Sequence, residues 1–163
     1  MNRRFALKTV IAAAGFAALA ACDQMMTTDL GIIDVAAADG SLNSFVAAAT
    51  AADLADTLRG PGPFTVFIPT DEAFAALPAG RLDTLMRPEN MDQLAAVLGY
   101  HIVRGAITAD QLIDQRQSVA TLNGTTVQID GRDGLRIGNV NIVTSDIRAS
   151  NGVIHVIDGV LLP

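Results

Sequence analysis

The chain has two histidines, His101 and His155, and each lies in a short run of apolar or β-branched residues. Imidazole transfers protons near neutral pH and binds transition metals, so two histidines with acids elsewhere in the chain form a candidate metal site. The competing interpretation is structural, because a histidine in an apolar strand usually hydrogen-bonds a main-chain group or a carboxylate. The apolar surroundings favour the structural interpretation, and we expect neither a metal nor a cofactor.

Nucleophilic catalysis is not indicated either. The sequence has no Gly-x-Ser-x-Gly elbow and no phosphate-binding glycine-rich loop. Asp71 and Glu72 begin a helix-like segment, where the helix dipole favours acids. Residues 131–134 (Gly-Arg-Asp-Gly) are typical of a turn. We therefore expect a protein that is not an enzyme.

The single cysteine, Cys22, closes an N-terminal targeting segment. Arg3, Arg4 and Lys8 form a basic start, residues 10–21 form a short Ala-rich apolar run, and Leu-Ala-Ala-Cys ends the segment, a pattern that resembles the bacterial lipoprotein lipobox. We expect residues 1–21 to be a signal peptide, Cys22 to be acylated, and residues 22–29 to tether the domain to a membrane. The alternative is an ordinary secretory signal followed by an incidental buried cysteine.

The export route stays open on sequence grounds. Residues 3–8 resemble a twin-arginine signal, with Ala6 where phenylalanine is preferred, and a general secretory signal fits equally well. Asp23 follows Cys22, and in some bacteria an Asp at that position retains a lipoprotein at the inner membrane. The predicted location is the cell envelope, facing the periplasm or the cell surface.

Charge and composition narrow the possible partners. Apolar residues make up 50% of the chain and aromatic residues 4%, with no Trp, so the core must be aliphatic. After Cys22 the chain keeps eight of eleven basic residues and all seventeen acids, a net charge of −9, and Lys8 is the only lysine. Such a surface argues against nucleic acid and against electrostatic binding to anionic lipids. An unknown protein or polysaccharide is the expected partner, and a monomer is favoured.

Helices are expected before strands. Apolar periodicity and capping residues predict helices over residues 30–39, 42–49, 51–58, 71–77, 78–87, 91–98 and 108–113. Ser41 is expected to cap the second helix, Asn90 with Gln93 and Thr108 with Gln111 to form capping boxes, and Gly40 and Gly99 to end helices. Strands are expected over residues 64–68, 100–103, 118–122, 125–130, 135–137, 140–144 and 153–158. This order indicates an α+β fold of one domain over residues 30–163.

The last of these strands is the most informative. It follows Asn151-Gly152, a tight-turn signal, and it is apolar on both faces apart from His155. A strand apolar on both sides is usually a central strand covered on both faces. We expect it to close the core.

Three segments together resemble the fasciclin domain family. Residues 64–74 resemble its first motif, residues 98–103 its Tyr-His motif, and residues 151–163 its second motif, in the family's order and spacing. Ile68 and Arg104 depart from the family pattern. The resemblance implies a fasciclin-like β-wedge or sandwich of short strands, with a helical cluster from the N-terminal half, and an adhesive function in the cell envelope.

The resemblance also places candidate residues together. Its first and Tyr-His motifs should approach each other, so we expect Asp71, or alternatively Thr70, to hydrogen-bond His101. Tyr100 is expected in the core, with exposure on a binding surface, together with His101, as the alternative. The predicted function is a lipid-anchored adhesion module that acts by multivalent weak recognition, and the alternative is a periplasmic accessory lipoprotein that binds an envelope component.

Overall fold

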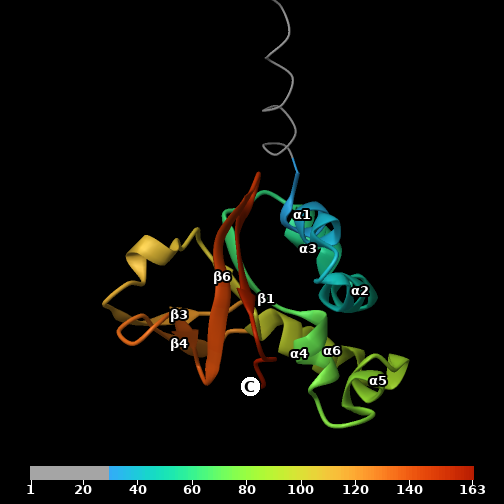
Figure 1. The fold of residues 1–163 in the computed structure, drawn as a ribbon. Coiled ribbons are helices and arrows are strands. Elements are labelled where there is room, and N and C mark those ends of the chain that lie inside the picture. The colour runs from blue at the N-terminus through green and yellow to red at the C-terminus, as the bar shows by residue number, and fades with distance from the viewer. Residues whose placement is uncertain (1–29) are drawn as a thin grey trace, which may run out of the picture.

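The structure is a computed structural model that describes residues 30–163 (Figure 1). The predicted signal peptide, Cys22 and the whole predicted tether lie outside the described residues. The helices are α1 (Ile32–Asp39), α2 (Asn43–Ala51), α3 (Leu54–Arg59), α4 (Asp71–Ala75), α5 (Arg81–Leu85), α6 (Met91–Tyr100) and the 3₁₀ helices η1 (Pro88–Asn90) and η2 (Ala109–Gln111). The strands are β1 (Phe64–Pro69), β2 (Ile102–Arg104), β3 (Arg116–Ala120), β4 (Thr126–Asp130), β5 (Arg136–Ile137), β6 (Val140–Ala149) and β7 (Gly152–Ile157).

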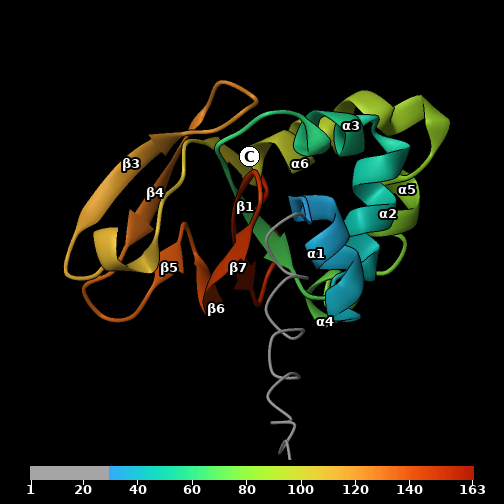
Figure 2. The same cartoon turned by 90° about the horizontal axis from the view of Figure 1, so that it is seen from above.

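The strands form one sheet in the order β2-β1-β7-β6-β5-β4-β3. β1 and β7 pair in parallel, with Phe67 opposite His155, and every other pair is antiparallel. β6 has ten residues and register shifts after Ile142 and Thr144, so it belongs to both halves of the sheet. The helices gather on one side of the β1–β7 pair, and β3 and β4 extend away on the other side (Figures 1 and 2). The α+β class is confirmed.

Alternation along β1 and β7 fills two separate cores. Val66, Ile68, Ile154 and Val156 pack into the cluster formed with the helices. The opposite face contributes to a second cluster formed with the strands beyond β6, whose members include Phe67, Ile157, Val127, Ile129 and Ile137. The last strand is expected to be buried on both faces. This expectation is confirmed, because residues 153–157 are all buried.

Several helix boundaries differ from the prediction. Gly40 ends α1 in the left-handed region at φ 79°, as expected, but α2 begins only at Asn43 and has no side-chain cap from Ser41. The Ser41 hydroxyl bonds the Asp39 carboxylate instead. α3 begins later than expected, after Asp53, which has φ 59°. Neither predicted capping box forms its side-chain cap, and the Asn90 side chain donates to the Thr84 carbonyl oxygen at 2.7 Å.

Gly99 does not end α6, because the helix continues through Tyr100. A Cβ at Gly99 would lie 3.2 Å from the Cβ of Asn123, so this glycine allows the β3–β4 turn to approach the helix. The predicted strand 100–103 is therefore shorter, with Tyr100 helical and His101 at the helix end. No helix among residues 30–163 combines the length and apolar character needed to cross a bilayer.

Candidate functional site

His101 is held by two main-chain groups. Its Nδ1–H donates to the Val97 carbonyl oxygen at 2.7 Å, which caps the end of α6, and its Nε2 accepts the Leu161 N–H at 3.0 Å. The side chain is 1% exposed, and this burial lowers its pKa to about 4. The ring is therefore neutral at neutral pH. It fastens α6 to the C-terminal segment that follows β7.

The expected hydrogen bond from Asp71 or Thr70 to His101 is wrong. Thr70 caps α4 by accepting the Ala73 N–H at 3.1 Å. The Asp71 carboxylate accepts the Ser44 N–H at 2.7 Å, and this main-chain donor lowers the pKa of Asp71. Both residues therefore act at helix starts, and Asp71 fastens α4 to α2.

His155 lies between two strands and a loop. Its ring stacks on Phe67 of β1 with ring centres 5.3 Å apart, and its Nε2–H donates to the Ile107 carbonyl oxygen at 2.8 Å. The Asp146 N–H lies 3.4 Å from Nδ1. Burial lowers the pKa of His155, against the opposing effects of the Ile107 carbonyl and the Asp146 charge. The structural interpretation of both histidines is supported by these main-chain bonds.

Two further polar side chains, which sequence patterns did not indicate, bond to the segment after β2. The Thr65 hydroxyl, which is buried, donates to the Gly105 carbonyl oxygen at 2.6 Å and accepts the Ile107 N–H at 2.8 Å. Asp146, with φ 59°, accepts the Ala109 N–H at 2.8 Å. Together with His155, these residues fix the loop from three directions.

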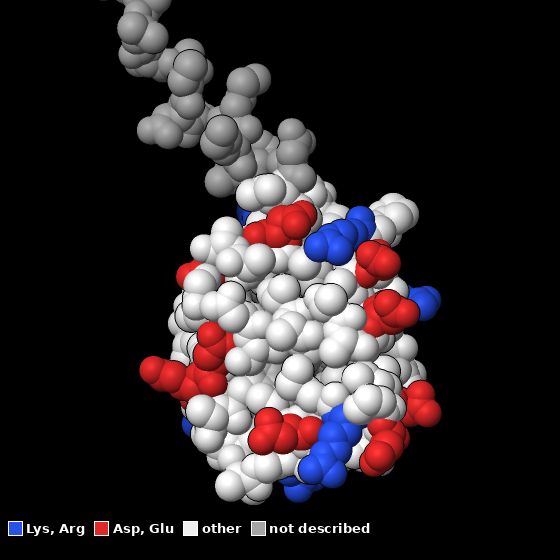
Figure 3. Space-filling view, turned by 90° about the vertical axis from the view of Figure 1, so that its right-hand side faces the viewer, with Lys and Arg blue, Asp and Glu red and all other residues white. Residues whose placement is uncertain are grey.

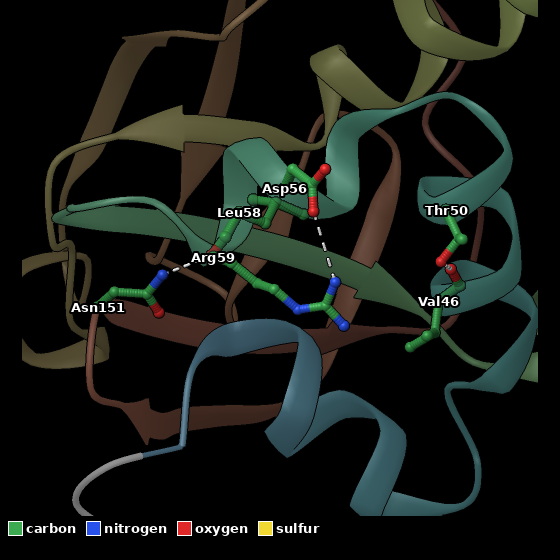
Figure 4. A network of polar contacts seen from close by, with 6 residues as sticks. All are labelled: Val46, Thr50, Asp56, Leu58, Arg59 and Asn151. Atoms are coloured by element: carbon green, nitrogen blue, oxygen red, sulfur yellow. Dashed lines mark hydrogen bonds and ion pairs between the residues drawn. The ribbon is translucent and has the colours of Figure 1, made fainter.

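Asn151 is a junction and not only a turn residue (Figure 4). Its side-chain oxygen accepts the Ile32 N–H at 3.0 Å, while its side-chain amide donates to the carbonyl oxygens of Leu58 and Gly60. Its own carbonyl accepts the Phe64 N–H at 3.1 Å. One side chain thus joins the start of α1 and the end of α3 to the β6–β7 connection. The Asn-Gly pair indicated a turn, but the hydrogen-bond partners of the Asn151 side chain lie about 90 or more residues away in the chain and could not be predicted.

Gly152 is required by close contact. A Cβ there would lie 2.0 Å from the Phe64 carbonyl oxygen and 2.9 Å from Cδ1 of Ile32. Gly62 is equally confined, because a Cβ on it would lie 2.0 Å from the Asn151 carbonyl oxygen. Neither glycine has positive φ, so the chain turns at residues 150–151 without a left-handed glycine, and Gly152 is needed for space.

Tyr100 lies partly in the core and partly at the surface. It is half-buried against the second core and also borders a cavity of about 430 Å³ formed with β3, β4 and the β5–β6 turn. His101, the other candidate for binding, is buried away from solvent. Within residues 30–163 no three His, Cys, Asp or Glu side chains gather as metal ligands.

A second groove, of about 630 Å³, lies where the chain enters the domain. It is bordered by residues 61–63, by Ala106 and Thr108, and by residues 148–153. The Ser150 N–H donates to the Leu30 carbonyl oxygen at 2.8 Å, so the first described residue lies beside this groove.

The surface over the helices carries no single-sign charged patch. On the face drawn in Figure 3, acidic and basic side chains are scattered around a central area without charged groups. This face therefore offers no concentrated field that would attract a polyion.

The chain is similar to known proteins in both sequence and fold. A family profile described as Fasciclin domain matches residues 40–163. Protein sll1483 and Uncharacterized protein sll1735 of Synechocystis are 48% and 44% identical to this chain, over 88% and 80% of it and over 77% and 96% of their own lengths. Human periostin is 38% identical over 81% of this chain, which spans only 16% of periostin. A solved FAS1 domain pair from insect fasciclin I has a similar fold, with TM-score 0.60 and 19% identity, over 76% of this chain and 46% of that one.

Proposed function

The chain belongs to the fasciclin domain family, and from this membership we propose that it is an exported, lipid-anchored module that adheres to a partner outside the cytoplasm. Insect fasciclin I, whose domain pair shares the fold, is described as a cell adhesion molecule. The anchor would be an acylated Cys22. Acyl chains supply about 0.8 kcal/mol per buried CH₂, so several chains on one residue hold a protein firmly at a bilayer.

The observation that supports the proposal is that both histidine side chains are engaged in structural hydrogen bonds. Both ring nitrogens of His101 and Nε2 of His155 bond main-chain groups, and both rings are buried. These side chains hold elements together and are not available to a substrate. The exposed side chains of the described domain are therefore the ones left to meet a partner, as in a binding module.

The chain's entry point supports an oriented attachment. Residues 23–29 separate Cys22 from Leu30, and a fully extended chain of this length reaches at most about 30 Å. Leu30 is fixed beside Ser150 at the β6–β7 end of the sheet. An anchored domain would then stand close to the membrane on that end. Weak contacts made at the other end by many anchored copies would add up, since multivalency raises avidity by ~10²–10⁴.

Metabolic labelling with a clickable palmitate analogue, followed by membrane fractionation, tests the anchor. We expect label on the wild-type protein and none on the Cys22→Ser variant, whose protein should leave the membrane fraction. A variant at the neighbouring position, Asp23→Ser, is the matched control and should keep its label. Label retained by Cys22→Ser would refute the anchor.

Protease treatment of intact cells tests the adhesive function. We expect the domain to be cleaved, and cells that carry it to attach to a surface better than cells that produce Cys22→Ser. A domain protected from protease on intact cells would point instead to the accessory lipoprotein of the periplasm.

A further inference from the structure

The 430 Å³ cavity beside Tyr100, called here the polar cavity, has an ordered set of charged side chains. Arg116 of β3 lies opposite Asp130 of β4, and Asp130 lies opposite Arg136 of β5. Residues directly opposite each other on neighbouring strands share a face of the sheet, so the three form one cation–anion–cation row. Further polar residues of the lining include Gln128 of β4 and Asn139 of the β5–β6 turn.

Contacts within the protein hold part of this row in place. One Arg116 Nη2–H donates to the Gln128 side-chain oxygen at 2.8 Å, and Arg116 Nε lies 3.7 Å from the Asp130 carboxylate. The other Asp130 oxygen accepts the Arg132 N–H at 3.1 Å. Among residues 30–163, Arg136 enters no ion pair, and its side chain is exposed at the cavity. The site therefore combines fixed polar groups with guanidinium donors open to a ligand, and a fixed site loses less entropy on binding.

The charges of the polar cavity cancel. Arg116 and Arg136 are balanced by Asp130 and Asp133, which also lines the cavity. The protein as a whole has a net charge of −6, which disfavours a polyanion. Because strong donors and strong acceptors alternate over a short span, the complementary ligand is uncharged and carries adjacent groups that both donate and accept, as sugar hydroxyls do.

Size and lining separate a glycan from a peptide. Ligand cavities generally measure about 300–1,000 Å³, and a cavity of 430 Å³ suits a short segment of sugar rings. Peptide-binding surfaces centre on a buried apolar pocket for an aromatic or aliphatic anchor, whereas here the lining is mainly polar, and Tyr100 contributes an aromatic side wall.

We propose that the polar cavity binds a neutral oligosaccharide segment through the Arg116–Asp130–Arg136 row. This inference deepens the proposed adhesive function and rests on it. The cavity is bordered by the β5–β6 turn, at the start of β6, whereas the chain enters beside Ser150, just past the end of β6 (Figure 1). A ten-residue strand spans about 30 Å, so the cavity of an anchored domain would lie away from the membrane.

Isothermal titration of the full exported protein in detergent tests the proposal, with dextran and mannan as neutral probes and alginate as the anionic probe. We expect at least one neutral polysaccharide to bind, and alginate to bind more weakly. Arg136→Gln and Asp130→Asn should each weaken binding by about tenfold or more, the effect of losing a hydrogen bond to a charged group, while the melting temperature stays unchanged. Arg59→Gln is the matched control, because Arg59 is also an exposed arginine but lies on α3, away from the polar cavity, and this variant should bind normally.

Four outcomes would overturn the inference: no binding of either neutral probe, stronger binding of alginate, equal binding by the Arg136→Gln/Asp130→Asn double variant, or competition by peptides alone. The attachment assay separates the inference from the proposed function. If Cys22→Ser abolishes attachment while the double variant attaches normally, the cavity inference fails and the adhesive function stands. If the double variant loses neutral-glycan binding but the domain proves inaccessible on intact cells, the cavity stands and surface adhesion fails.

Discussion

In the β1–β7 pair, polar side chains are buried and bond to main-chain groups, whereas across β3, β4 and β5 they are exposed and bond mainly to one another. His155 and Thr65 each reach main-chain atoms of the loop after β2. Arg116, by contrast, reaches the side chains of Gln128 and Asp130. A buried polar group left without a partner is costly, while an exposed ion pair contributes little. The polar side chains of the β1–β7 pair are therefore expected to contribute much more to stability than those of the β3–β5 face.

Gly152→Ala should break the β1–β7 pair most severely. The new Cβ would meet the Phe64 carbonyl oxygen at 2.0 Å, so the strands must separate at their first paired residues. We expect the free energy of unfolding to fall by about 4 kcal/mol or more, measured by urea denaturation. Gly124→Ala in the β3–β4 turn is the control. It has φ 88° but nothing within 4 Å of the added Cβ, and should lose only about 1–2 kcal/mol.

Acidification should act on the β1–β7 side through His101. The folded pKa of about 4 lies below the ordinary value of 6.5, so the unfolded chain binds a proton that the folded chain does not. The stabilising effect is complete above pH 6.5 and disappears as the pH falls to 4, a loss of about 3 kcal/mol from this residue. His155, whose pKa is also lowered by burial, adds a loss of the same sign.

Urea denaturation at several pH values measures this dependence, with His101→Gln as the comparison. The variant should be less stable at neutral pH, and its stability should depend less on pH between 6.5 and 4. Parallel curves for the two proteins would show that His101 is not protonated selectively in the unfolded chain.

Asn151→Asp tests the junction with a side chain of the same shape. A carboxylate keeps the acceptor for the Ile32 N–H but places charge against the carbonyl oxygens of Leu58 and Gly60. We expect a loss of about 2 kcal/mol by thermal denaturation. Asn139→Asp, in the exposed β5–β6 turn, should change stability by less than about 0.5 kcal/mol. An equal loss of stability in both variants would show that the hydrogen bonds of Asn151 do not stabilise the fold.

The smallest effect is expected at Asp130→Asn. The Arg116–Asp130 pair is exposed, and the asparagine oxygen can still accept the Arg132 N–H. Stability should change by less than about 0.5 kcal/mol in urea. A loss above about 2 kcal/mol would mean that the β3–β5 row is structural, and the contrast between the two regions would fail.

The elements that could be predicted from sequence are those that local patterns specify. Apolar residues on both faces of residues 153–157 indicated a central strand, and Gly40 marked the end of α1. Gly99 misled the prediction because its role is contact with Asn123, which no local pattern shows. The distant partner of His101 could not be found for the same reason, since the Leu161 N–H lies 60 residues away; the other partner, the Val97 carbonyl, is one helical turn back.

For the candidate sites as well, local features could be predicted and distant contacts could not. The structural character of both histidines could be predicted from their apolar neighbours, but the Asp71–His101 bond could not be judged from motif proximity. Thr70 instead accepts the Ala73 N–H at the start of its own helix, and Asp71 accepts the Ser44 N–H in the first turn of α2, which the fold brings beside it. Both N–H groups lie at helix starts, where an intrahelical partner is lacking. The row formed by Arg116, Asp130 and Arg136 has no signal in the sequence, because it exists only through strand register.

The parallel pairing of β1 with β7 also sets a schedule for biosynthesis. Each residue of β1 pairs with a residue 88 positions later in the chain, so β1 cannot pair with β7 until the end of the chain has been synthesised. At about 5–20 residues per second, a ribosome needs roughly 4–18 seconds to make the intervening chain. During this interval β1 lacks its β7 neighbour, so the unfinished polypeptide exposes the edge of β1 to chaperones.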